Sequence, residues 1–77
     1  MNFSYKFYQV KYKKDKADWV STYQAAVSYA EFLCESYPKI LNKTVDIYGV
    51  INEVSETKEL IAQIDCKTKK LNIKRVH

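Results

Sequence analysis

The spacing of apolar residues changes its period along the chain, and this change predicts one helix flanked by strands. Between Ser21 and Pro38 the apolar residues recur at helical spacing, while polar residues occupy the opposite face. Ser21 and Gln24 have the spacing of a capping box, which predicts where the helix begins. Pro38 disfavours a helical residue before it, so we expect the helix to span residues 22–37. The stripe predicted to face the core consists of Tyr23, Ala26, Val27, Ala30, Leu33, Cys34 and Tyr37.

The remaining apolar segments alternate with a period of two, which predicts β-strands. Residues 3–12 form an aromatic first strand, and residues 17–20 form a short second one. Residues 44–54, 59–66 and 70–77 are separated by short turns, which favours an antiparallel meander. Their predicted inward positions are Val45, Ile47, Ile51, Leu60, Ala62, Ile64, Cys66, Leu71 and Ile73.

Two features of these strands predict local irregularity. The first strand carries aromatic residues on both faces, with Tyr5 and Phe7 on one and Tyr8 and Tyr12 on the other. Either both faces are covered, or a bulge near Phe7 and Tyr8 changes which face turns inward. Gly49, the only glycine of the chain, lies within a strand, which indicates a bulge or a close backbone contact.

These patterns predict a single α+β domain over residues 1–77, in the order β-(β)-α-β-β-β. One amphipathic helix packs on one face of an antiparallel sheet. A chain of 77 residues, 47% of them apolar, has room for one core and not for two. No apolar run approaches the roughly 20 residues that a membrane-spanning helix needs. The N-terminal segment has no continuous apolar signal core, so we expect a cytoplasmic protein without membrane contact.

Cys34 and Cys66 are expected to be buried, reduced thiols in that compartment, and a disulfide between them is the alternative. Neither cysteine belongs to a C-x-x-C pair, and His77 is the only histidine. A zinc site needs about four such ligands at set spacings, so we expect no metal and no other cofactor.

Catalysis is not expected from the residue types present. One glycine cannot build a glycine-rich phosphate loop. A cysteine or serine nucleophile would need a histidine base, and His77 is the last residue. Glu31 and Glu35 lie one helical turn apart, but a solvated polar face explains them more simply than acid–base chemistry does. We therefore expect a protein that acts by binding.

Charge is distributed unevenly along the chain. Residues 1–16 hold five lysines and one aspartate, and residues 67–77 hold four lysines and one arginine. Residues 17–66 hold three lysines against eight acidic residues. If the first strand pairs with the C-terminal meander, the basic residues could converge on one edge and attract a polyanion. The alternative is that these lysines only protect turns and edge strands from aggregation. The candidate basic binding edge consists of Lys11, Lys13, Lys14, Lys16, Lys67, Lys69, Lys70, Lys74 and Arg75.

Twelve lysines against one arginine favour phosphate contacts that are blind to sequence over the reading of bases. Tyr5, Tyr8 and Tyr12 could stack on the bases of a single strand, and packing in the core is the alternative. A second candidate surface, for a protein partner, is the outer flank of the helix, with Tyr29 and Phe32. A loop at residues 38–41 that folds over these rings is the alternative there. This candidate flank consists of Tyr29, Phe32, Glu31 and Glu35.

An aromatic first strand, the helix start "STYQA" at residues 21–25 and a trailing meander together resemble small phage-encoded anti-CRISPR proteins. The resemblance covers the plan of the whole chain and transfers no functional residue. It implies a protein without an enzymatic site that occludes a surface of a nucleic-acid-guided complex. The predicted partner is therefore a host protein or ribonucleoprotein complex. The alternative is a nucleic-acid-binding accessory protein that uses its lysine clusters without sequence specificity. An edge strand or the flank at Phe32 could self-associate, so the oligomeric state stays open.

Overall fold

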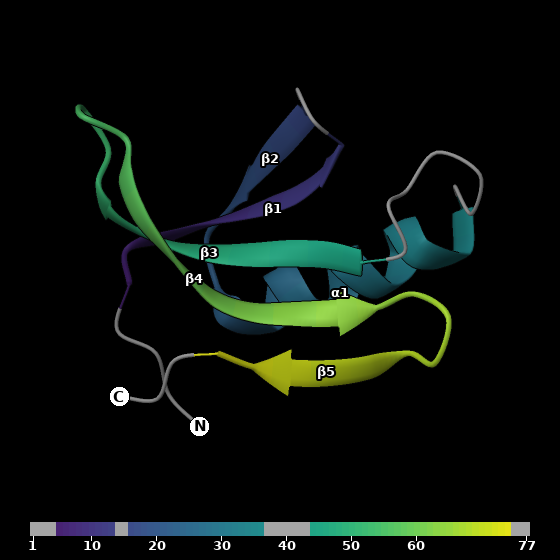
Figure 1. Cartoon of the computed structure of the whole chain (residues 1–77). Helices are drawn as coiled ribbons and strands as arrows, with labels where there is room; N and C mark the ends of the chain where they lie inside the picture. Colours follow the sequence, from purple (N-terminus) through teal and green to yellow (C-terminus); the bar gives the residue numbers. More distant parts are fainter. Residues whose placement is uncertain (1–4, 14–15, 37–43, 75–77) are drawn as a thin grey trace.

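The alternating strands and the amphipathic helix fold into two layers, a five-stranded antiparallel sheet and a helix packed on one of its faces (Figure 1). The computed structural model describes residues 5–13, 16–36 and 44–74. The elements in chain order are β1 (Phe7–Lys13), β2 (Lys16–Val20), α1 (Tyr23–Ser36), β3 (Thr44–Asn52), β4 (Thr57–Asp65) and β5 (Lys70–Ile73).

The strands lie in the order β2-β1-β3-β4-β5, and every neighbouring pair is antiparallel. The predicted α+β fold and the C-terminal meander are therefore confirmed. The N-terminal hairpin extends this meander because β1 pairs with β3, for example with Val10 opposite Ile47. Strands β2 and β5 form the two edges of the sheet. Among the described residues, no helix has the length and apolar character needed to cross a membrane.

Helix α1 begins one residue later than the sequence predicts. The Oγ1 of Thr22 accepts a hydrogen bond from the backbone N–H of Ala25 at 3.0 Å. The carbonyl of Thr22 accepts the first helical bond, from Ala26, also at 3.0 Å. Thr22 is thus the capping residue in place of Ser21. The chain bends at both Ser21 and Thr22 after β2, so the helix begins only at Tyr23. The predicted end of the helix, residue 37, lies outside the described residues.

The core lies between α1 and the sheet, as the predicted helical stripe requires. Ala26 and Ala30 are fully buried, and their small side chains let the helix backbone approach the sheet. Burial of Leu33, which is 2% exposed, stabilises the fold by about 1.5–3 kcal/mol. The core residues contributed by the sheet are Tyr8, Val10, Val45, Ile47, Ile61, Ala62 and Ile64.

Strand β1 turns Tyr8 and Val10 toward the helix and therefore turns Phe7 toward the open face, which is the side of the sheet opposite α1. Tyr5 also packs on the helix side, where its ring meets that of Tyr8 edge-on with the centroids 5.8 Å apart. The chain bends at Lys6. The change of face thus occurs at this bend before β1, and not at a bulge between Phe7 and Tyr8.

Gly49 makes the close contact that its place within a strand predicts. It lies in β3 beside the ring of Tyr5, and a Cβ atom here would come within 2.6 Å of three carbons of that ring. The hydroxyl of Tyr5 donates a hydrogen bond to Glu59, which lies opposite Gly49 on β4. The backbone of Gly49 does not adopt a left-handed conformation, so the glycine provides space rather than an unusual turn.

A β-bulge in β4 changes which residues face the core. Ile47 pairs with Ala62, but the next residue, Tyr48, pairs with Leu60, so Ile61 is the extra residue. Ile61 is fully buried, while Leu60, which the alternation predicts to point inward, is only half-buried. The strict period of two is therefore wrong for this part of β4.

Two further residues predicted to point inward are exposed. Ile51 is 59% exposed because the register of β3 and β4 is interrupted between Val50 and Asn52, close to the hairpin tip. Ile73 is 41% exposed at the edge strand β5. The hairpin between β3 and β4 projects beyond the rest of the sheet (Figure 1), and Val54 at its tip is 97% exposed.

Cys34 and Cys66 form a disulfide, so the expectation of two reduced thiols is wrong and its alternative is correct. The bond joins the last turns of α1 to the residue after β4, across a separation of 32 positions. Helical spacing and strand alternation each assign a cysteine to the core side, but neither pattern shows that the two meet. A salt bridge of 3.4 Å between Lys69 and Glu35 ties the same turn to the same helix.

Candidate functional site

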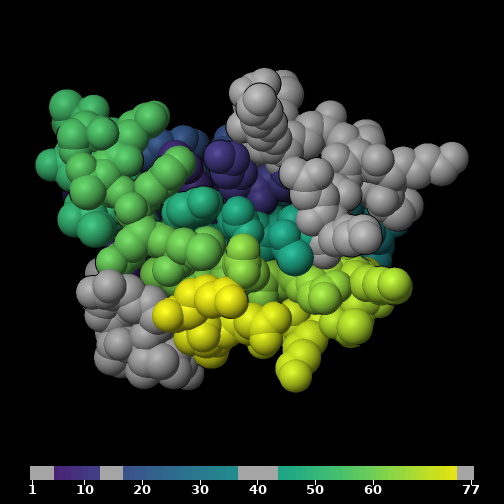
Figure 2. Space-filling view, viewed as in Figure 1, coloured from purple at the N-terminus to yellow at the C-terminus, as the bar shows by residue number. Residues whose placement is uncertain are grey.

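The open face of the sheet carries aromatic side chains on three adjacent strands. Gln9 of β1 lies between Trp19 of β2 and Tyr48 of β3. Paired residues of antiparallel strands point to the same face, so these side chains form one row across the sheet. Phe7 follows in the next row, and its ring centroid is 6.1 Å from that of Trp19 in an edge-to-face arrangement. Figure 1 shows α1 behind the sheet, and Figure 2 shows the open face from the same side.

Lys58 is held among these aromatic rings by two contacts. Its Nζ donates a hydrogen bond to Oε1 of Gln9 at 2.6 Å and lies 5.0 Å from the centre of the Tyr48 ring. The bond satisfies the amide oxygen of Gln9, a residue that is only 4% exposed. The cation–π contact contributes about 0.5–1 kcal/mol. Burial, with a smaller effect from the carboxylate of Asp46, raises the pKa of the Tyr48 hydroxyl, so this ring stays neutral at physiological pH.

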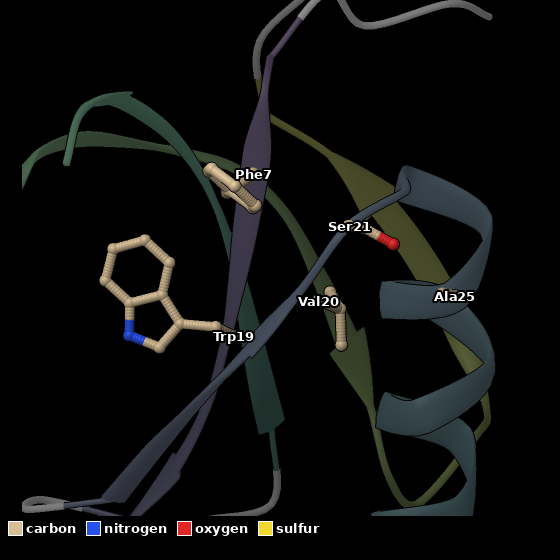
Figure 3. Close-up of a pocket in the computed structure, with 5 residues that line it drawn as sticks. All are labelled: Phe7, Trp19, Val20, Ser21 and Ala25. Carbon is tan, nitrogen blue, oxygen red and sulfur yellow. The ribbon is translucent and has the colours of Figure 1, made fainter.

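An open hollow of about 400 Å³ lies beside β2, at the margin of this face (Figure 3). The indole of Trp19 projects on the side of β2 that points away from α1, and it is 44% exposed. The size falls within the range of small-ligand sites, about 300–1,000 Å³, although the hollow is wide open. Its lining residues are Phe7, Trp19, Val20, Ser21 and Ala25.

Two residues of the predicted basic edge, Lys16 and Lys70, belong to the strands at opposite edges of the sheet. Strand β1 does pair with the meander, as the prediction required, but the strand order puts Lys16 on β2 and Lys70 on β5. The register places Lys11 of β1 and Lys70 of β5 toward the same end of the sheet, since Lys11 lies opposite Asp46, and Asp65 lies between Thr44 and Lys70.

The C-terminal lysines of this set are exposed, whereas part of the N-terminal set is not described. Lys69 makes a salt bridge of 3.4 Å with Glu35, so this turn contacts the helix. Lys14 and Arg75 lie outside the described residues, as do the side chains of Lys13 and Lys16. Lys11 is half-buried on the open face. The exposed members are Lys67, Lys69, Lys70 and Lys74.

Phe32 and Tyr29 stack on the outer flank of α1, with their ring centroids 6.4 Å apart and an angle of 16° between the planes. Phe32 is 54% exposed. Tyr29 is half-buried, and its hydroxyl donates a hydrogen bond to the carboxylate of Asp18 on β2. The ring of Tyr29 is thus fixed and supports the ring of Phe32. Glu31, the residue before Phe32 in α1, is exposed. The loop at residues 38–41 that the alternative places over these rings lies outside the described residues.

Tyr5, Tyr8 and Tyr12 do not form the predicted stacking platform. All three pack against the core on the helix side, and Tyr8 is 2% exposed. Burial raises the pKa of Tyr8. The residues that alternate with them, Phe7 and Lys11, face the open side instead. Packing in the core, which was the alternative, is therefore correct.

Among the described residues, no group of three or more His, Cys, Asp or Glu side chains could hold a metal ion. Three surfaces remain that carry candidate contacts. They are the open face, the turn after β4 with its exposed lysines, and the outer flank of α1. Comparison with protein-family models, with curated proteins and with solved structures finds no match to this chain.

Proposed function

We propose that this protein is a small non-enzymatic binding protein that inhibits a host nucleic-acid-guided defence complex of the CRISPR type by occluding one of its surfaces. The stacked pair of Phe32 and Tyr29 carries this proposal. An exposed aromatic side chain supported by a second one is unusual on a monomer, whereas aromatic anchors are enriched at protein interfaces.

The flank of α1 is suited to binding because its geometry is set before a partner arrives. Tyr29 is fixed by its hydrogen bond to Asp18, so the ring of Phe32 rests on an ordered support. A preordered anchor loses less conformational entropy on association than a free one. Glu31 is a further exposed residue of α1, and its charge favours a partner surface that is basic, such as the channel in which a ribonucleoprotein holds nucleic acid.

The proposed place of action is the host cytoplasm, which keeps most protein thiols reduced. The disulfide between Cys34 and Cys66 must then either resist reduction or be dispensable for the fold. Cys34 is 5% exposed, which limits the access of an attacking thiolate to the bond.

Replacement of Phe32 tests this function. We expect Phe32→Ala to weaken binding by about 30-fold, the loss of a typical interface hot spot, and to abolish protection of phage in cells that carry the defence complex. The measurement is the plating efficiency of a targeted phage on cells that express each variant. Gln24→Ala, at another exposed position of α1, is the matched control and should protect as well as the parent. Equal protection by both variants, with unchanged circular dichroism, would show that the flank is not the contact surface.

A second candidate function is binding of nucleic acid without sequence specificity. The observation that favours it is the turn after β4, where Lys67, Lys69 and Lys70 are all exposed. Lysines contact phosphates as point charges, so such binding should weaken steeply as salt rises. If this function is correct, replacement of Lys67, Lys69 and Lys70 by alanine should lower the affinity for nucleic acid of every sequence.

A further inference from the structure

We infer that the open face of the sheet is a binding site for single-stranded nucleic acid, with Trp19 as the stacking residue and Lys11 and Lys58 as the phosphate contacts. This inference rests on the second candidate function, which is nucleic-acid binding. It assigns that function to the open face instead of the exposed lysines of the turn after β4.

The open face is more apolar than an exposed sheet face normally is. Antiparallel sheets usually bury one face and present polar residues on the other. Here the face carries Phe7, Trp19 and Tyr48, and Val50 in the row of Phe7 is only 4% exposed. Within the described part of the chain, no helix or second sheet covers these residues.

Trp19 offers a ring to a planar ligand. Its indole is 44% exposed, and Phe7 supports it from one side. The wide-open hollow of about 400 Å³ beside it is lined mainly by apolar side chains. A nucleobase of any identity can stack in this way, because every base has an aromatic face.

Two lysines flank the row that contains Trp19. Lys58 pairs with Val50, one row beyond Gln9 on one side, and Lys11 lies one row beyond it on the other. Successive rows on one face are about 7 Å apart. The ammonium of Lys58 reaches back into the row of Trp19, where it contacts Gln9 and Tyr48, while Lys11 lies one row away on the other side. Among the described residues, no carboxylate lies within 4.0 Å of either lysine nitrogen.

The acidic group in the row of Lys11 is already engaged. The Oδ1 of Asp46 accepts a hydrogen bond from Nε2 of Gln63 at 2.7 Å. This bond from a neutral amide leaves the carboxylate charged, so the open face offers a ligand two ammonium groups and one carboxylate beside its rings. This combination of exposed ring and flanking ammonium groups matches the chemistry of a single strand, whose bases stack and whose phosphates carry the charge.

The same chemistry disfavours the other occupants. A duplex keeps the faces of its bases stacked inside, so it offers no free ring to Trp19. An apolar protein surface would bury the ammonium of Lys58 without a counter-charge, which is costly. A phosphodiester backbone would instead supply that counter-charge.

The test uses the full chain and a short single-stranded oligothymidylate, with a duplex of the same length for comparison. Trp19 is the only tryptophan, so its fluorescence reports stacking directly, and we expect quenching by the single strand that saturates. In fluorescence anisotropy of the labelled oligonucleotide, Trp19→Ala should weaken binding by about tenfold or more. Lys58→Gln and Lys11→Gln should each reduce the slope of log affinity against log salt by about 0.7. Phe32→Ala and Lys6→Gln, which lie off this face, are the matched controls and should bind like the parent.

Three outcomes would overturn the inference, and they separate it from the function on which it rests. The first is binding without quenching that Trp19→Ala leaves unchanged, while replacement of Lys67, Lys69 and Lys70 by alanine abolishes it. This result would place the contact at the turn after β4. Equal affinity for the duplex would exclude stacking on a free base. Absence of binding to either oligonucleotide would reject nucleic-acid binding altogether. Trp19→Phe, which keeps a ring at the edge of the sheet, replaces the alanine variant if the latter does not fold.

Discussion

At the scale of single residues, Gly49 decides where the ring of Tyr5 lies. The ring rests against bare backbone and reaches across to Glu59 on the next strand. In this way a residue outside the regular strands is anchored to two of them. The position of Gly49 within a strand predicts a close contact, but the partner in that contact depends on the bend at Lys6, which no pattern in the sequence announces.

We predict that Gly49→Ala destabilises the fold by about 1–3 kcal/mol, because the new methyl group meets the Tyr5 ring at 2.6 Å. Elsewhere the same change stabilises proteins by about 0.4–1 kcal/mol through the unfolded chain, so the sign of the effect reports the clash. Urea unfolding at neutral pH measures it. In the background of Tyr5→Ala the cost should largely disappear, and a cost that persists there would mean that the ring is not its cause.

At the scale of elements, most of the fold could be predicted because each element follows its own period. The helix and the antiparallel meander agree with the structure, whereas the side of β1 that faces the helix was left open by the sequence. The bulge at Ile61 could not be predicted, since an extra residue changes the phase of a strand without changing its composition. The cap at Thr22 was missed by one position because either hydroxyl residue can serve.

The disulfide is the strongest constraint between elements, since it closes a separation of 32 positions between α1 and the end of β4. We predict that its reduction lowers the free energy of unfolding by about 3–4 kcal/mol, mainly because the reduced unfolded chain is less constrained. Urea unfolding with and without a phosphine reductant measures this change.

The variant with Cys34→Ser and Cys66→Ser should show the lower stability in both conditions and no response to the reductant. If reduction leaves the parent unchanged, the bond does not hold the helix to the sheet. The result also bears on the proposed place of action, because a chain that works in a reducing cytoplasm must stay folded after this loss.

At the scale of the whole molecule, the candidate surfaces differ in how far the sequence predicts them. The flank with Tyr29 and Phe32 follows from a helical wheel alone, because one element supplies both rings. The open face needs β2, β1 and β3 side by side, so Trp19 and Tyr48 come together only through the strand order. The basic residues illustrate the same limit, because their sequence clusters do not show that β2 and β5 are opposite edges.

We propose that this protein acts by binding and occlusion, not by turnover. The most direct test of this proposal is to titrate the protein into a purified CRISPR-type effector complex of the host while the rate of DNA cleavage is measured. We predict that inhibition rises linearly with added protein, is complete at an equimolar amount and does not deepen with incubation, because each complex retains one inhibitor. Inhibition far below equimolar amounts that grows with time, or full cleavage activity in the presence of excess protein, would contradict the claim.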